Sequence, residues 1–102
     1  MNGSILIPEK FKLNGKSIDV ILDNGYCDDE KCLGEADFTQ SIITICSHDR
    51  GKKLSKKDRE QTFFHELVHM ILDSMGKDRL KYDEDFVDLF ATRLYEYEKT
   101  KQ

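Results

Sequence analysis

The stretch of sequence that decides the fold is SKKDREQTFFHELVHMILDSM, residues 55–75. Apolar side chains recur in it at intervals of three and four residues, a spacing typical of an amphipathic α-helix with one face in the core. Ser55 stands three residues before Asp58, as in an N-terminal capping box, and Gly76 fits the position just after a helix C-terminus. The sequence therefore predicts one helix over residues 55–75. Its expected buried face consists of Phe63, Phe64, Leu67, Val68, Met70, Ile71, Leu72 and Met75.

Two of the three histidines in the chain, His65 and His69, lie four residues apart in this predicted helix. Positions i and i+4 differ by about 40° around a helix axis and by about 6 Å along it, so both imidazoles point the same way. This spacing suits two nitrogen ligands on one zinc ion. Glu66 lies about 100° around the axis from His65, where its carboxylate can reach a metal-bound water.

The polar side of this helix has two interpretations. Any surface helix presents such a side to water, and the residues concerned here are Thr62, His65, Glu66, His69 and Asp73. However, no Lys or Arg occurs between residues 60 and 76, although the chain contains 16 basic residues. A solvated face usually mixes charges of both signs, so the pattern favours a metal site.

The sequence predicts a second helix, from about residue 83 to about residue 99. Its expected buried side consists of Phe86, Val87, Phe90, Leu94 and Tyr97. A separate stripe at helical spacing carries Glu84, Asp88, Ala91 and Tyr95. The small side chain of Ala91 in this stripe would let the two helices approach closely.

A zinc ion that keeps one position open for water needs three protein ligands. Glu84 is the third ligand that we predict, and its competitors are Asp73, Asp83 and Asp85. Asp88 lies one turn after Glu84 and can accept a hydrogen bond from the far ring nitrogen of a ligating histidine. The two predicted helices therefore supply a complete candidate metal site.

The first half of the chain has the pattern of β-structure. Residues 4–7 and 17–22 are rich in β-branched residues, and Asn14-Gly15 between them is a strong hairpin signal. A second extended pair is expected at residues 36–38 and 41–46. Strands that precede helices indicate an α+β protein. We therefore expect a single domain over residues 1–102, with a small N-terminal antiparallel β-sheet followed by two packed helices.

Composition narrows the class of protein. The 102 residues are 38% apolar and 35% charged, with one proline and six glycines, which fits a globular domain. The net charge of −4 disfavours binding to nucleic acid, and no apolar run reaches the ~20 residues of a membrane span. Residues 1–8 lack the charged and apolar regions of a signal peptide. We therefore expect a cytoplasmic protein that binds neither nucleic acid nor membranes.

The cysteines allow a rival metal site. Cys27, Cys32 and Cys46 together with His48 can be read as a structural zinc site of three thiolates and one imidazole. Their spacing matches no strong zinc motif, however, and an odd number of cysteines suits free thiols in a reducing cytoplasm. We expect free cysteines, with Cys46 at the end of a buried strand.

The segment TFFHELVH, residues 62–69, followed by EDFVDLFA, residues 84–91, resembles the gluzincin metallopeptidases. It is similar, more narrowly, to the ImmA/IrrE-like group, which has small members in phage and prophage genomes. The resemblance implies a minimal zincin-like fold and zinc ligation by His65, His69 and Glu84. It also implies a general base at Glu66 and an orienting role for Asp88. Val87 and Asp88 replace a more usual Ala-Asn pair, and we expect none of the appended helix-turn-helix domains that many relatives carry.

These patterns together predict a zinc-dependent metallopeptidase that hydrolyses a protein or peptide substrate, such as a regulatory protein. The strand at residues 42–45 is expected to be a sheet edge that pairs with an extended substrate. Tyr82, Tyr95 and His48 are the candidates for stabilising an oxyanion. The alternatives are a non-catalytic, zinc-stabilised binding or regulatory module of phage origin and a helical scaffold in which the histidines are incidental.

Overall fold

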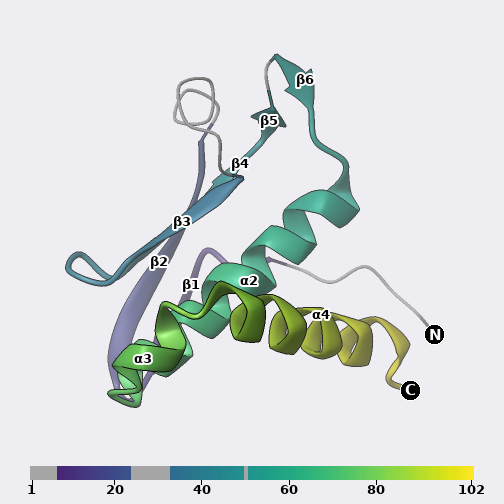
Figure 1. The fold of residues 1–102 in the computed structure, drawn as a ribbon. Coiled ribbons are helices and arrows are strands. Elements are labelled where there is room, and N and C mark those ends of the chain that lie inside the picture. Colours follow the sequence, from purple (N-terminus) through teal and green to yellow (C-terminus); the bar gives the residue numbers. More distant parts are fainter. Residues whose placement is uncertain (1–6, 24–32, 50) are drawn as a thin grey trace.

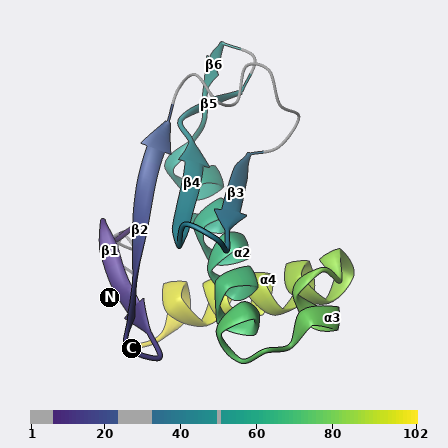
Figure 2. The ribbon, with the colours of Figure 1, turned by 90° about the vertical axis from the view of Figure 1, so that its left-hand side faces the viewer.

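The computed structural model of this chain describes residues 7–23, 33–49 and 51–102. A four-stranded sheet and a two-stranded hairpin come first in the chain, and two long packed helices follow (Figure 1). The first long helix packs against the sheet, and the second packs against the first (Figure 2). The α+β class predicted from the order of the elements is confirmed. Among the described residues, no helix combines the length and apolar character needed to cross a membrane.

The elements have the following bounds. The strands are β1 (Lys10–Leu13), β2 (Lys16–Asp23), β3 (Gly34–Asp37), β4 (Ile42–Cys46), β5 (His48–Asp49) and β6 (Lys52–Lys53). The helices are α2 (Lys56–Ser74), α3 (Asp78–Lys81) and α4 (Glu84–Thr100). The predicted long helices are thus confirmed within one or two residues at each end. The short helix α3 and the β5–β6 hairpin were not predicted.

The hairpin signal at Asn14-Gly15 is confirmed. Both residues have positive φ, 52° and 80°, as a two-residue hairpin turn of the mirror-image kind requires. This turn joins β1 to β2 in an antiparallel pair. The first strand of the hairpin is therefore β1 rather than residues 4–7, of which residues 4–6 lie outside the described part of the chain.

The order of the strands corrects two predictions. The order is β1-β2-β4-β3, and β2 pairs with β4 in parallel, so the sheet is mixed rather than antiparallel. In addition, β4 is an interior strand, and the sheet edge on that side is β3 rather than residues 42–45. The side chains of Ile43 and Ile45 are fully buried, which suits a strand that is paired on both sides and covered by a helix.

Both ends of α2 are capped as the sequence predicts. The Ser55 hydroxyl accepts a hydrogen bond of 3.1 Å from the backbone N–H of Asp58. At the other end Gly76 has a φ of +71°, a conformation that favours glycine. The N–H groups of Gly76 and Lys77 donate to the carbonyls of Asp73 and Leu72, so the helix ends in a closed Schellman turn.

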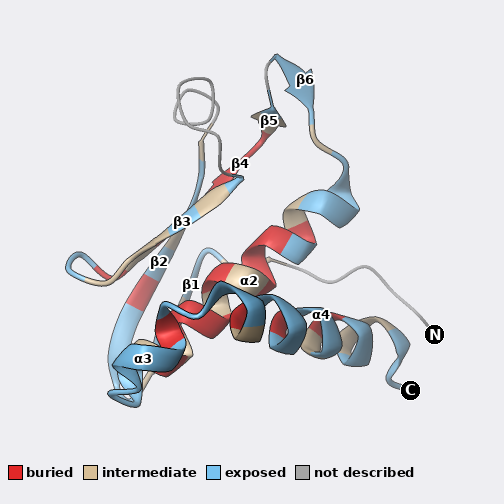
Figure 3. Cartoon of the chain, in the orientation of Figure 1, coloured by how far each residue is buried: buried red, intermediate tan, exposed pale blue. Residues whose placement is uncertain are grey.

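The buried face predicted for the first helix is largely confirmed, whereas the face predicted for the second is wrong in part. In α2 most of the expected core residues are buried or half-buried, and Met75 is exposed. In α4 the buried residues are Val87, Ala91 and Tyr95, while Phe90 and Tyr97 are 52% and 59% exposed (Figure 3). The helix is rotated because the stripe that contains Ala91 faces α2.

A buried polar contact joins the two long helices. Glu60 of α2 is only 1% exposed, and its Oε1 accepts a hydrogen bond of 2.8 Å from the Tyr95 hydroxyl of α4. The Lys99 ammonium lies 3.7 Å from the same oxygen. Burial, and then the hydrogen bond and charge of Glu60, raise the pKa of Tyr95 to about 12. The phenol therefore stays protonated and donates to the carboxylate at neutral pH.

Tyr95→Phe removes the hydroxyl that donates to Glu60 and leaves a buried carboxylate oxygen without that partner. We expect the free energy of unfolding, measured by urea denaturation, to fall by about 1–3 kcal/mol. Tyr97→Phe is the matched control because this ring is exposed, and it should change the free energy by less than about 0.5 kcal/mol. An equal effect of the two substitutions would show that the Tyr95 hydroxyl does not stabilise the helix pair.

Candidate metal centre

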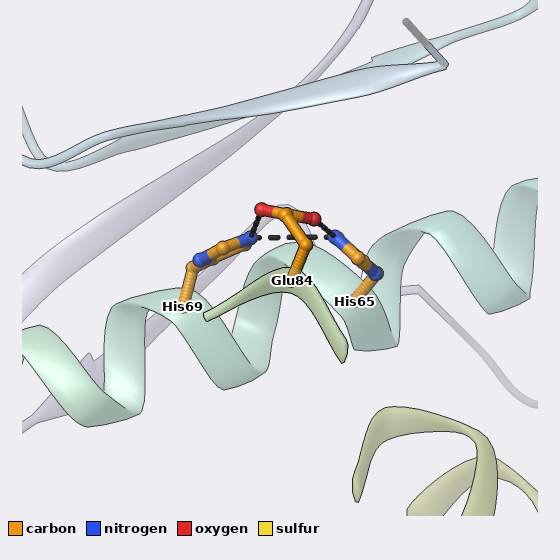
Figure 4. A group of neighbouring side chains, drawn as sticks. All are labelled: His65, His69 and Glu84. Atoms are coloured by element: carbon orange, nitrogen blue, oxygen red, sulfur yellow. Dashed lines mark hydrogen bonds and ion pairs between the residues drawn. The ribbon is translucent and has the colours of Figure 1, made fainter. Parts of the chain in front are cut away.

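Two imidazoles from α2 and one carboxylate from α4 converge on a single point. The Nε2 atoms of His65 and His69 lie 3.3 Å apart, and each lies 3.0 Å from a different oxygen of Glu84. Figure 4 shows the three side chains pointing toward one another from the two helices. Within the described part of the chain, this is the one group of three or more potential ligands close enough to hold a metal ion.

The separations within this triad fit a metal ion of the size of zinc. Atoms that share one tetrahedral zinc, at about 2.0–2.2 Å from it, lie about 3.3–3.6 Å apart. The triad atoms are 3.0 to 3.3 Å apart, so a small expansion suffices. Three protein ligands leave the fourth tetrahedral position open to the cleft. The His65, His69 and Glu84 group could therefore hold a metal ion.

The hydrogen bond on the far side of His69 determines which ring nitrogen is free. His69 Nδ1 lies 2.6 Å from the backbone carbonyl oxygen of Lys81. A carbonyl only accepts, so Nδ1 donates, and the Nε2 of the neutral ring carries a lone pair toward Glu84. Electron-rich atoms then face one another at hydrogen-bond distance. This arrangement needs a cation or an additional proton between them, and a metal ion meets that need.

The residue predicted to orient a histidine is only loosely placed. Asp88 Oδ1 lies 3.7 Å from His65 Nδ1, which is longer than a hydrogen bond. The closer support belongs to His69 and comes from a backbone carbonyl, a group that no side-chain pattern in the sequence reveals. Among the competitors of Glu84, Asp73 pairs with Lys81 and Asp83 caps α4 by accepting from the N–H of Phe86.

The side chain of Lys81 fixes the carbonyl that supports His69. Lys81 is only 8% exposed, and its ammonium lies 2.7 Å from Asp73 of α2 and 3.4 Å from Asp78. The ammonium also lies 4.5 Å from the ring centroid of Phe38, which follows β3. The hydrogen bond to Asp73 raises the pKa of Lys81, so the ammonium stays charged at neutral pH. The end of α3 is thereby held against α2.

Glu66 lies beside the triad, between α2 and the edge strand β3. A Cβ at Gly34 of β3 would stand 2.6 Å from Thr62 Cγ2 and 2.9 Å from the Thr44 carbonyl oxygen, so only glycine fits there. This absence of a side chain lets β3 approach the turn that carries Glu66. Burial, followed by the charges of Glu84 and Glu35, raises the pKa of Glu66 to about 8. A cation held by the triad would act against this rise.

An open cavity of about 620 Å³ contains the triad and Glu66. Its walls come from β3, α2 and the first turns of α4, so the candidate metal centre lies in a cleft of the size that small ligands and peptides occupy. The lining residues are Leu33, Gly34, Glu35, Ala36, Phe38, Asp58, Gln61, Thr62, His65, Glu66, His69, Tyr82, Glu84 and Asp88.

Of the three residues suggested for oxyanion stabilisation, only Tyr82 lines this cleft. Tyr95 donates its hydroxyl to Glu60 on the other side of α2, so that assignment is wrong. His48 lies in β5, where its Nδ1 is 2.8 Å from the Ser47 hydroxyl, and it does not line the cleft either. Tyr82 is exposed and follows α3, from where its hydroxyl can reach a ligand.

The cysteines do not form the rival site as it was outlined. Cys46 is buried and disulfide-bonded, so it is neither the expected free cysteine nor a thiolate ligand. The disulfide also removes one reason for expecting a reducing compartment. Cys27 and Cys32, as well as the acidic segment next to them, lie outside the described residues.

The Lys81 side chain can be tested as a support of the metal centre. Lys81→Met and Asp73→Asn each break the ion pair that positions the carbonyl behind His69. We expect zinc affinity, measured by competition with a chromogenic chelator, to fall about 10- to 100-fold in both. Lys77→Met is the control, because it removes the same charge from an exposed side chain. Unchanged zinc affinity in a folded Lys81→Met variant would contradict this role.

The contributions of Glu84 and Asp88 of α4 to zinc affinity can be compared directly. Glu84→Ala removes one of the three converging groups, so we expect it to abolish stoichiometric zinc binding. Asp88→Ala removes a group at 3.7 Å from the histidine ring, and its cost should be about tenfold or less. Isothermal titration calorimetry measures both, and the opposite order would exclude Glu84 as the ligand.

Comparison with known proteins gives no independent assignment. No protein-family model, no curated protein sequence and no solved structure matches this chain. The resemblance to gluzincins therefore depends on residues 62–69 and 84–91 alone. The structure supports one part of this resemblance, because it brings His65, His69 and Glu84 together as a group that could hold a metal ion.

Proposed function

We propose that this chain is a zinc-dependent metallopeptidase that hydrolyses a peptide bond in an extended protein or peptide segment. One observation carries the proposal. His65, His69 and Glu84 converge at 3.0 to 3.3 Å, and the buried carboxylate of Glu66 lines the same cleft. A metal-ligand group with a carboxylate beside it is the arrangement that metal-assisted hydrolysis needs.

The donor set supports zinc as the metal. Two imidazole nitrogens and one carboxylate oxygen are typical of catalytic zinc sites that keep a position open for water. Magnesium and calcium prefer sites made of oxygen atoms only. The supported Nδ1 of His69 also fits zinc, because a ligating histidine usually donates its other N–H to a fixed acceptor.

Bound zinc would lower the pKa of a water from ~15.7 toward ~7 and polarise the carbonyl of the substrate. The proposed role of Glu66 is to accept a proton from the attacking water and to deliver it to the leaving amine. This role is supported by the fact that Glu66 lines the same cleft as the triad. Tyr82 is the candidate hydrogen-bond donor to the oxyanion, because its hydroxyl belongs to an exposed side chain at the rim.

The edge strand β3 supports a polypeptide as the substrate. The carbonyl of Leu33 accepts from the N–H of Cys46 in β4, and backbone groups alternate along an antiparallel pair. The backbone groups of Gly34 and Ala36 are therefore directed to the open edge. Both residues line the cleft, so an extended peptide can pair with β3 and pass over the triad.

One observation favours a non-catalytic alternative. The ligands come from α2 and α4, so a bound metal joins the two helices and would stabilise the fold whether or not it supports hydrolysis. In that case the chain is a zinc-stabilised binding module, and the open edge of β3 holds a partner without cleaving it. The conservative substitution of Glu66 separates these two functions.

Glu66→Gln keeps the size of the side chain and removes its ability to accept a proton. We expect the variant to bind one zinc per chain, as counted by native mass spectrometry, and to lose at least about 100-fold in kcat/KM on unfolded protein substrates. Glu96→Gln is the control because Glu96 is exposed on α4 outside the cleft. If the zinc-loaded wild type hydrolyses no substrate although zinc raises its Tm, the binding module replaces the peptidase.

A further inference from the structure

We propose that the cleft selects a substrate segment with a lysine or arginine near the hydrolysed bond, and that Glu35 and Asp58 recognise this cationic side chain. The inference depends on the proposed peptidase function and adds the class of substrate to it. It starts from the charges that line the cleft rather than from the metal ligands.

The lining of the cleft is strongly acidic. Among the described residues, five carboxylates contribute to it and no Lys or Arg does, although the chain contains 16 basic residues. The five are Glu35, Asp58, Glu66, Glu84 and Asp88. The ammonium of Lys81, close behind His69, is turned to Asp73 and Asp78 and does not neutralise the lining.

Two of these carboxylates have no function in the metal centre. Glu84 belongs to the triad, Glu66 is the proposed base, and Asp88 lies beside His65. Among the described residues, neither Glu35 nor Asp58 has an ion pair through its side chain, and both are exposed. Glu35 follows Gly34 on β3 and lines the same cleft as Glu66. These two acids therefore remain available to a cation from outside.

A second observation points to a ligand in the same cleft. Glu66 is only 7% exposed, and its carboxylate has no hydrogen-bond partner among the described residues. The Glu66 side chain lines the cleft, so its carboxylate oxygens are free to accept from a group that enters the cavity. A substrate that brings a positive charge also offsets the repulsion between Glu66 and Glu35.

The positions of the acids set the spacing from the bond. Asp58 precedes His65 by seven residues on α2, which is about 10 Å along the helix axis. Three residues of an extended peptide cover about 10 Å. The selected cation is therefore expected within about three residues of the hydrolysed bond.

The opposite end of the cleft is aromatic. There the rings of Phe38 and Tyr82 lie 6.2 Å apart, and Phe38 also contacts the ring of His69. Asp58 precedes His65 on α2, whereas Phe38 contacts His69, the ligand farther along the same helix. An extended segment on β3 would thus place a cationic side chain at one end and an apolar side chain at the other.

The test uses two fluorogenic peptides that are identical except for Lys or Glu within three residues of a central bond. With the zinc-loaded protein, we expect kcat/KM to be about tenfold higher for the Lys peptide at low salt. The preference should fall below about twofold in 0.5 M NaCl, because salt screens exposed charge pairs. It should also fall below twofold in the double variant Glu35→Gln, Asp58→Asn.

The control is the double variant Asp49→Asn, Glu96→Gln, which changes the net charge equally at exposed positions outside the cleft. It should keep the full preference for the Lys peptide. The ratio of the two peptides is the readout, because Glu35→Gln also changes the environment of Glu66 and thus the rate itself. A preference that survives in the Glu35, Asp58 variant, or that favours the Glu peptide, overturns the inference.

A binding measurement tests the preference for a cationic side chain independently of hydrolysis. Zinc-loaded Glu66→Gln is mixed with each labelled peptide, and fluorescence anisotropy gives the two Kd values. Tighter binding of the Lys peptide supports the inference, and equal Kd values overturn it. Absence of hydrolysis with both peptides in the wild type counts against the proposed peptidase function instead, so the two failures are distinguishable.

Discussion

The convergence of electron-rich atoms between α2 and α4 is the constraint on which this structure depends. His69 donates its Nδ1 proton to the Lys81 carbonyl, so in the neutral ring the Nε2 lone pair faces Glu84 at 3.0 Å. Atoms of this kind repel one another unless a positive charge lies between them. The start of α4 therefore meets the middle of α2 around a group that could hold a metal ion. The Glu60–Tyr95 hydrogen bond holds the same pair of helices elsewhere, with the Lys99 ammonium 3.7 Å from the same Glu60 oxygen.

Neighbouring elements hold the two sides of α2 in place around this point. On one side β3 comes close because Gly34 has no side chain that would strike Thr62 or the Thr44 carbonyl. On the other side α3 is fixed by the buried pair of Lys81 and Asp73. The ring of Phe38, just after β3, lies under the Lys81 ammonium and so connects the two supports. The close approach at Gly34 thus positions the β3 wall of the cleft, and the Lys81–Asp73 pair positions α3 on the other side.

The local patterns of the sequence predicted the helices and the metal triad well. The spacing of His65 and His69 is set by a single helix, so it can be read locally. Glu84 was predicted as the third ligand because it lies at the start of the next predicted helix. The order of the strands was not predictable, because parallel pairing of β2 with β4 depends on contacts far apart in the chain. The rotation of α4 was missed for a related reason, since apolar residues occur on both of its sides. The support of His69 by a backbone carbonyl has no side-chain signature at all.

The parallel pairing of β2 with β4 has a consequence for how the molecule assembles. No tight turn can join two parallel strands, so this pairing closes a loop of the chain between residues 23 and 42. The β3–β4 hairpin can form from local contacts and then dock on β2 as a unit. Gly34 and Glu35 travel with that hairpin, whereas His65 and His69 need only α2. During folding, the imidazole pair is therefore expected to exist before the wall that encloses it, and the cleft is completed at the slower, non-local step.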